Sequence, residues 1–175
     1  MEEQIEICKD ILSFGIKPTE RIIHFGCGDE QTNLLHNMQT LMPNTFYLGV
    51  DANEKVISSY IEQYKHIPYY AFKHNNMQSF IDEMIDNYGN QLQFETTIIT
   101  GIFDKPLYKE KQYIFISTTI DNCLSFSNSV IFTIDENYYR QYNYNILYVV
   151  NNLISTFTNV EMKKKQNKYI FYVTI

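Results

Sequence analysis

Short strand-like segments and amphipathic helical segments alternate along almost the whole of this 175-residue sequence. Residues 21–25 are apolar and run into glycines, and residues 45–51 and 94–100 are rich in β-branched and aromatic side chains. Between the last two, residues 77–88 carry apolar side chains at helical spacing. Strands that alternate with helices form parallel sheets with helices on both faces. The pattern therefore predicts an α/β fold with a mostly parallel sheet.

The last two strand-like segments constrain the topology further. The sequence predicts strands over residues 21–25, 45–51, 69–73, 94–100, 129–134, 158–163 and 169–175, and helices within residues 5–14, 29–41, 53–64, 77–88, 106–124 and 138–155. Only residues 164–168 separate the final two strands. Because a parallel crossover needs a dozen or more residues, one of them must run antiparallel. A closing antiparallel hairpin is therefore expected.

Composition limits the class of protein. Hydrophobic residues make up 45% of the sequence, close to the usual ~45–50% of soluble proteins. A chain of about 150 residues already buries roughly 70% of its unfolded surface. These values exclude a disordered chain, a collagen-like chain and a small disulfide scaffold, and they leave little room for a second catalytic domain.

Charge disfavours nucleic acid as a partner. The formal net charge is −6, whereas phosphate contacts need clustered lysines and arginines. The main basic run, Lys163 to Lys165 with Lys168, is interpreted as the solvated tip of the closing hairpin.

Cysteine and histidine spacing predicts no metal site. Cys8, Cys27 and Cys123 are odd in number and far apart, so neither a zinc site nor a disulfide framework is indicated.

Free thiols are typical of a reducing compartment. The first residues are acidic, and no apolar run approaches the ~20 residues that span a bilayer. The expected location is cytoplasmic, with no membrane association.

A glycine pair and an acidic residue indicate a ligand site. Gly26 and Gly28 directly follow the first predicted strand, and Asp51 ends the second, 23 positions after Gly28. Such glycines let the backbone approach a ligand, and an acid about 20 positions on binds ribose hydroxyls in doubly wound sheets. A plain tight turn with a solvated Asp51 is the alternative. Gln31 stands where dinucleotide-binding motifs have a third glycine, which weighs against NAD.

In these residues the sequence resembles the class I S-adenosylmethionine-dependent methyltransferases. HFGCGDE resembles their first motif, YLGVDANEKVISSY their second, HNNMQSF their third and TTIITGIF the end of their fourth strand. The closing hairpin resembles their antiparallel seventh strand. The resemblance implies a Rossmann-like, seven-stranded, mostly parallel sheet with a C-terminal antiparallel hairpin. It also implies one methyltransferase-like domain over residues 1–175, S-adenosylmethionine as cofactor and S-adenosylhomocysteine as product.

The resemblance also implies roles for single residues. The turn would cradle the methionine part of the cofactor, the acid would accept both ribose hydroxyls, and the residues of the third motif would hold the adenine. In chain order the implied cofactor-binding residues are His24, Gly26, Cys27, Gly28, Asp51, Ala52, Asn75, Asn76, Met77 and Thr100, with Asn75 and Asn76 as near-equal choices for the adenine.

Two departures from the family pattern bear on activity. His24 stands where the family has an acid, and the imidazole lacks the charge that favours an ammonium or sulfonium group. Residues 100–103 replace the Asn/Asp-Pro-Pro-aromatic signature of nucleobase amino methylation. Asp104 and Tyr108 are weak catalytic candidates, with ordinary loop roles as the alternative. A small molecule or a protein side chain is the expected acceptor. A catalytically degenerate binding module and an NAD-dependent enzyme are the rival interpretations.

Overall fold

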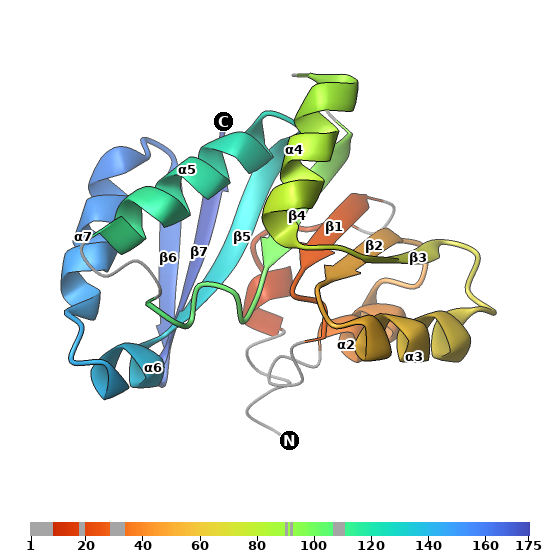
Figure 1. Ribbon diagram of the computed structural model, residues 1–175, viewed down its shortest axis with the longest axis horizontal. Coiled ribbons are helices and arrows are strands. Elements are labelled where there is room, and N and C mark those ends of the chain that lie inside the picture. Colours follow the sequence, from red (N-terminus) through yellow and green to blue (C-terminus); the bar gives the residue numbers. More distant parts are fainter. Residues whose placement is uncertain (1–8, 18–19, 29–33, 90, 92, 107–110) are drawn as a thin grey trace.

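The computed structural model describes residues 9–17, 20–28, 34–89, 91, 93–106 and 111–175. They form a seven-stranded sheet in the order β3-β2-β1-β4-β5-β7-β6 (Figure 1). The strands are β1 (Arg21–Phe25), β2 (Phe46–Asp51), β3 (Tyr70–His74), β4 (Phe94–Ile99), β5 (Ser127–Asp135), β6 (Val160–Lys165) and β7 (Lys168–Thr174). The predicted α/β class with a mostly parallel sheet is confirmed.

Strand direction follows the expectation for the closing hairpin. The strands β1 to β5 are parallel to one another, while β7 lies between β5 and β6 and runs antiparallel to both. The chain order reverses at β1, whose neighbours are β2 and β4. In sheets of this kind ligands bind outside the carboxyl ends of the strands at such a reversal.

Helices cover both faces of the sheet (Figure 1). They are α2 (Leu34–Leu41), α3 (Glu54–Tyr64), α4 (Met77–Tyr88), α5 (Gln112–Leu124), α6 (Glu136–Gln141) and α7 (Ile146–Thr156). One apolar cluster joins α4, α5 and α7 to one face, and a second joins α2 and α3 to the other. Within the described ranges, none of these helices has the length and hydropathy that crossing a bilayer requires.

The predicted helix over residues 138–155 is wrong, because two helices occupy this region. Asn143 has a φ of 51°, a left-handed conformation that ends α6. The Asn145 side chain then accepts a hydrogen bond from the Tyr148 N–H (3.3 Å) and begins α7. The apolar spacing continues across this break, so periodicity alone did not reveal it.

The prediction that Lys168 belongs to the solvated tip of the closing hairpin is wrong. It pairs with Asp135 in the β5–β7 register, and its side chain is buried. The Lys168 Nζ lies 3.6 Å from the Asp104 Oδ2 and 4.0 Å from the Asp135 Oδ2. Burial of a lysine demands such partners, so the cluster ties β7 to the segment after β4.

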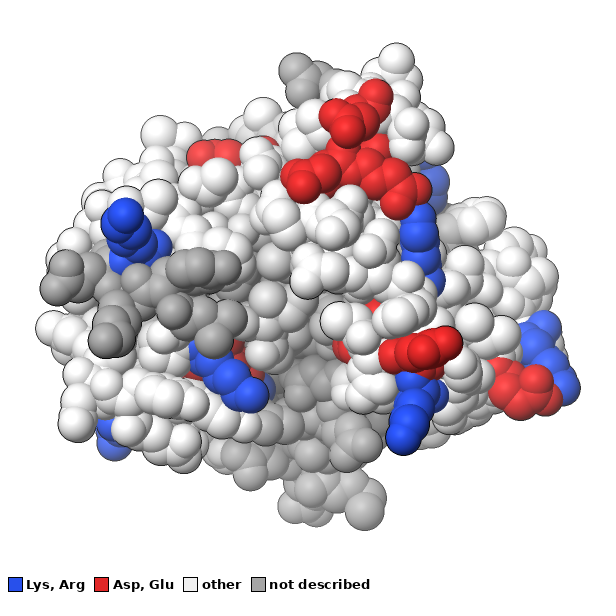
Figure 2. All heavy atoms as spheres, viewed as in Figure 1, with Lys and Arg blue, Asp and Glu red and all other residues white. Residues whose placement is uncertain are grey.

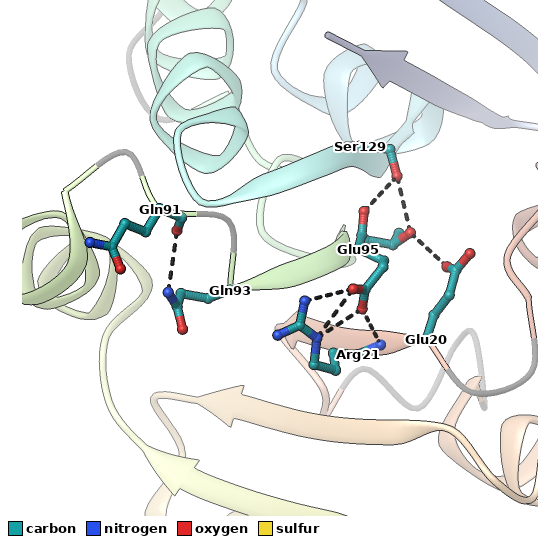
Figure 3. Close-up of polar contacts among 7 residues, drawn as sticks. Glu20, Arg21, Gln91, Gln93, Glu95 and Ser129 are labelled. Carbon is teal, nitrogen blue, oxygen red and sulfur yellow. Dashed lines mark hydrogen bonds and ion pairs between the residues drawn. The ribbon is translucent and has the colours of Figure 1, made fainter.

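Polar side chains join β1, β4 and β5 near their amino ends (Figure 3). Glu95 accepts hydrogen bonds from the Arg21 backbone N–H (2.6 Å) and from its guanidinium group. The Ser129 hydroxyl donates to the Glu95 carbonyl (3.3 Å) on the neighbouring strand. These contacts tie β1, β4 and β5 together at the edge of the sheet opposite to the carboxyl ends.

Candidate functional site

The turn after β1 requires glycine at position 26. Gly26 has a φ of 74°, in the left-handed region, and a Cβ atom there would lie 2.1 Å from the Thr100 carbonyl oxygen. Its N–H donates to the Val50 carbonyl (2.9 Å). The turn is therefore packed between the carboxyl ends of β2 and β4, and a glycine, which has no side chain, fits this position.

Asp51 is held in place by two backbone N–H groups. The Gly28 N–H donates to its Oδ2 atom (3.0 Å) and the Asn53 N–H to its Oδ1 atom (2.8 Å). A Cβ atom on Gly28 would lie 3.0 Å from the Asp51 Oδ2, so the turn approaches the carboxylate closely. Each carboxylate oxygen can accept further hydrogen bonds. The side chain is thus oriented before any ligand arrives.

A cavity of about 570 Å³ opens beside this turn. Its volume lies within the ~300–1,000 Å³ that is usual for small-molecule sites. The lining residues are Gly26, Val50, Asp51, Ala52, Asn75, Asn76, Met77, Gln78, Ile102 and Phe115. Among these lining residues Asp51 alone carries a formal charge, so the cavity combines one anionic anchor with amide groups and apolar walls.

Six of the ten cofactor-binding residues implied by the resemblance line this cavity. They are Gly26, Asp51, Ala52, Asn75, Asn76 and Met77. The other four, His24, Cys27, Gly28 and Thr100, lie in or beneath the turn and are not among the lining residues. The side chains of His24, Cys27 and Thr100 are buried. Contact between the backbone of the turn and a ligand stays a prediction.

Sequence reasoning missed four residues of the cavity wall, which are Val50, directly before Asp51, and Gln78, Ile102 and Phe115. Gln78 and Ile102 lie within segments already singled out, directly after Met77 and close after Thr100. Phe115 comes from α5, and nothing in its local pattern marks it, because only the packing of α5 brings it to the cavity.

Asn75 and Asn76 combine a structural role with their place at the cavity. The Asn76 Oδ1 accepts the Gln78 N–H (2.9 Å) as the N-cap of α4, and the Asn75 Oδ1 accepts the Asn76 N–H (2.8 Å). An amide oxygen has a second lone pair, and the side-chain NH₂ is a donor. Both residues can therefore hydrogen-bond a heterocycle while keeping their local bonds.

Replacing the Asn76 cap should weaken α4. Asn76→Ala is expected to lower the free energy of unfolding by about 1 kcal/mol, because an orphan N–H at the helix start loses its acceptor. Asn76→Asp keeps the acceptor and should stay close to wild type. Urea denaturation followed by circular dichroism measures both, and equal losses in the two variants would contradict the capping role.

His24 is buried beneath the turn and does not face the cavity. Its ring bridges the Tyr47 hydroxyl (Nδ1, 2.8 Å) and the Thr100 hydroxyl (Nε2, 2.7 Å). Burial lowers the pKa of His24 from 6.5 to about 3. The ring is therefore neutral at physiological pH, and it stands where the resemblance would place a negative charge.

This burial makes folding stability dependent on pH on the acid side. Since the unfolded chain binds a proton near pH 6.5 and the folded chain only near pH 3, stability falls as the pH drops between these values. From pH 6 to pH 5, His24 should cost up to about 1.4 kcal/mol, the value for one proton. Urea denaturation at both pH values should show this loss in wild type but not in His24→Gln, and equal losses in both proteins would contradict it.

The two catalytic candidates fare differently. Asp104 is buried, and its Oδ1 accepts the Asp135 N–H (2.7 Å) while its Oδ2 faces Lys168. These contacts suit a residue that fixes the segment after β4 rather than an accessible base. Tyr108 lies outside the described residues.

Comparison with known proteins gives a consistent result for the fold. No protein-family model and no curated protein matches the sequence. Among solved structures, the N-methyltransferase NodS from Bradyrhizobium japonicum WM9 is 13% identical, with 99% of this chain and 94% of NodS covered at a TM-score of 0.62. NodS in complex with S-adenosyl-L-homocysteine is 14% identical, with 99% of this chain and 85% of that chain covered at 0.62.

A third similar structure is the CurJ carbon methyltransferase, which is 11% identical. The match covers 98% of this chain and 53% of CurJ, with a TM-score of 0.64. At identities this low, the structural similarity shows a shared fold alone. The chain therefore has the Rossmann-like fold of the class I methyltransferases.

Proposed function

We propose that this protein transfers a methyl group from S-adenosylmethionine to an acceptor. The observation that carries the proposal is the Asp51 carboxylate, fixed by two backbone N–H groups at the carboxyl end of β2 and facing the cavity. Methyltransferases among the solved structures of the same fold support it, including one bound to S-adenosyl-L-homocysteine.

The residues present fit the cofactor. Asp51 offers carboxylate oxygens to a ribose diol, the acceptor arrangement that the two hydroxyls need. Ala52 and Met77 supply apolar surface for an adenine ring, and Asn75 and Asn76 supply amide groups for its edge. The backbone of the turn from Gly26 to Gly28 would then contact the methionine part of the cofactor.

Bound S-adenosylmethionine would supply an activated methyl group, which the acceptor would take up directly with S-adenosylhomocysteine as the leaving group. The chain's own contribution is then to position the two reactants, which can account for much of the rate. The apolar wall of Ile102 and Phe115 would exclude water from the reacting end.

The proposed acceptor is a small molecule or a protein side chain, handled by one domain over residues 1–175. The net charge of −6 opposes binding to a polyanion. On the face shown in Figure 2, lysine and arginine side chains are scattered, and the described residues form no continuous basic patch there. A surface of this kind does not attract a phosphate backbone.

A binding module that holds the cofactor without turnover is the second candidate. Two observations favour it: His24 is neutral and buried, and Asp104 is engaged with Lys168. In that case the protein would bind S-adenosylmethionine and act through a partner.

Calorimetric titration tests the proposal. S-adenosylmethionine, S-adenosylhomocysteine and NADH are titrated into the protein, and S-adenosylhomocysteine formation is then followed with candidate acceptors. The proposal expects both adenosyl ligands to bind and NADH not to bind. Absence of binding at millimolar adenosyl ligand would overturn it, and binding without turnover across the acceptors would favour the binding module.

A further inference from the structure

A chain of hydrogen bonds links the three neighbouring strands β2, β1 and β4 beneath the glycine turn. The Tyr47 hydroxyl on β2 contacts the His24 Nδ1 on β1 (2.8 Å), and the His24 Nε2 contacts the Thr100 Oγ1 after β4 (2.7 Å). The Thr100 hydroxyl donates to the Gly26 carbonyl (3.2 Å). His24, Tyr47 and Thr100 are at most 2% exposed, so water does not substitute for these bonds.

The direction of each hydrogen bond can be deduced. The Gly26 carbonyl can only accept, so the Thr100 hydroxyl donates its proton there and must accept from the His24 Nε2–H. The unprotonated Nδ1 then accepts from the Tyr47 hydroxyl. In the other tautomer, Thr100 would turn its proton to His24, and both the Gly26 carbonyl and the Tyr47 proton would lose their partners. Because unpaired buried polar groups are costly, the first arrangement is favoured.

We propose that Tyr47, His24 and Thr100 form a positioning relay that sets the Gly26 carbonyl and thereby the shape of the cofactor turn. The inference rests on the proposed function, since it assigns these residues to the site that binds S-adenosylmethionine. Tyr47, His24 and Thr100 are not among the lining residues of the cavity. They act through Gly26, which does line it.

The relay acts on a turn residue whose backbone is already constrained. The Gly26 N–H is bound to the Val50 carbonyl (2.9 Å), and the relay fixes the carbonyl on its other side. Both peptide planes that flank the Gly26 Cα are then held, so the turn is pre-organised for its ligand. A neutral polar relay thus occupies the place where the resemblance expects a charged side chain.

Cofactor affinity of four variants tests the relay. Thr100→Val removes the donor to Gly26 and should weaken S-adenosylhomocysteine binding about tenfold, whereas Thr100→Ser keeps the hydroxyl and should stay within about threefold of wild type. Tyr47→Phe should weaken binding several-fold alone but add nothing in the Thr100→Val background, because the relay is already broken there. Multiplicative losses in the double variant would overturn the relay.

Thr97→Val is the matched control. Thr97 is a buried threonine of β4 whose hydroxyl bonds Ser127 (2.8 Å), away from the turn. It should lose stability as Thr100→Val does yet bind S-adenosylhomocysteine as wild type does. Equal weakening of binding in Thr97→Val and Thr100→Val would show general destabilisation and would overturn the proposal.

A second measurement separates failure of the relay from failure of the proposed function. In the ligand-free protein, a long-range ¹H–¹⁵N NMR spectrum of the His24 ring should show Nε2 protonated and Nδ1 bare, with Nδ1 shifting in Tyr47→Phe. A ring protonated at Nδ1 overturns the relay whatever the protein binds. If the ring has the expected tautomer but wild type binds no adenosyl ligand, the proposed function is overturned. The role of the relay in the cofactor site is then overturned with it.

Discussion

Asp51→Ala is expected to lower the affinity for S-adenosylhomocysteine by about 100-fold or more. A hydrogen bond to a charged group contributes about 1.5–3 kcal/mol, and two ribose hydroxyls would lose the same acceptor. A 100-fold loss corresponds to about 2.7 kcal/mol, which two such bonds readily exceed. Calorimetric titration of wild type and variant measures the ratio directly.

Two further variants separate ligand contact from damage to the turn. Asp51 also accepts the Gly28 and Asn53 N–H groups, so Asp51→Asn, which keeps one oxygen, should lose less affinity than Asp51→Ala. Glu54→Ala removes the same charge three residues away, on an exposed side chain at the start of α3, and should bind normally. Equal affinity in wild type and Asp51→Ala would refute the assignment of the ribose to Asp51.

Gly26→Ala should both destabilise the fold and abolish cofactor binding. The added methyl group would lie 2.1 Å from the Thr100 carbonyl oxygen, a backbone atom that cannot move without shifting the end of β4. The φ of 74° adds about 1–2 kcal/mol of conformational strain. We expect a loss of about 3 kcal/mol in the free energy of unfolding, since clash and strain add. Urea denaturation measures the loss.

Gly89→Ala is the control for this substitution. Gly89 also has a positive φ, 57°, but an added Cβ atom would meet no other described atom within 4 Å. Strain alone should then cost about 1–2 kcal/mol, with binding unchanged. If the two alanine variants lost equal stability and both bound the ligand, the close packing of Gly26 against Thr100 would not matter for the site.

Local sequence determined most of the elements and the anchor of the site. The predicted helix over residues 77–88 coincides with α4, and the predicted strand over residues 21–25 coincides with β1. The short spacing of the last two strands is enough to require the antiparallel hairpin, because no parallel crossover fits into so few residues. Gly26 and Asp51 are recognisable for a similar reason, since a turn after one strand and an acid at the end of the next are defined by positions along the chain.

Only the tertiary structure decided which polar residues face the cavity and which support it from below. His24 was expected at the ligand, yet its partners Tyr47 and Thr100 lie 23 and 76 residues away in sequence. Lys168 looked like part of a solvated run, whereas the β5–β7 register places it beside Asp135. A polar side chain in a strand has the same local pattern whether water or a distant side chain satisfies it. Only the pairing of strands in the assembled sheet brings that distant partner within hydrogen-bond distance, so the local sequence cannot show which of the two satisfies the side chain.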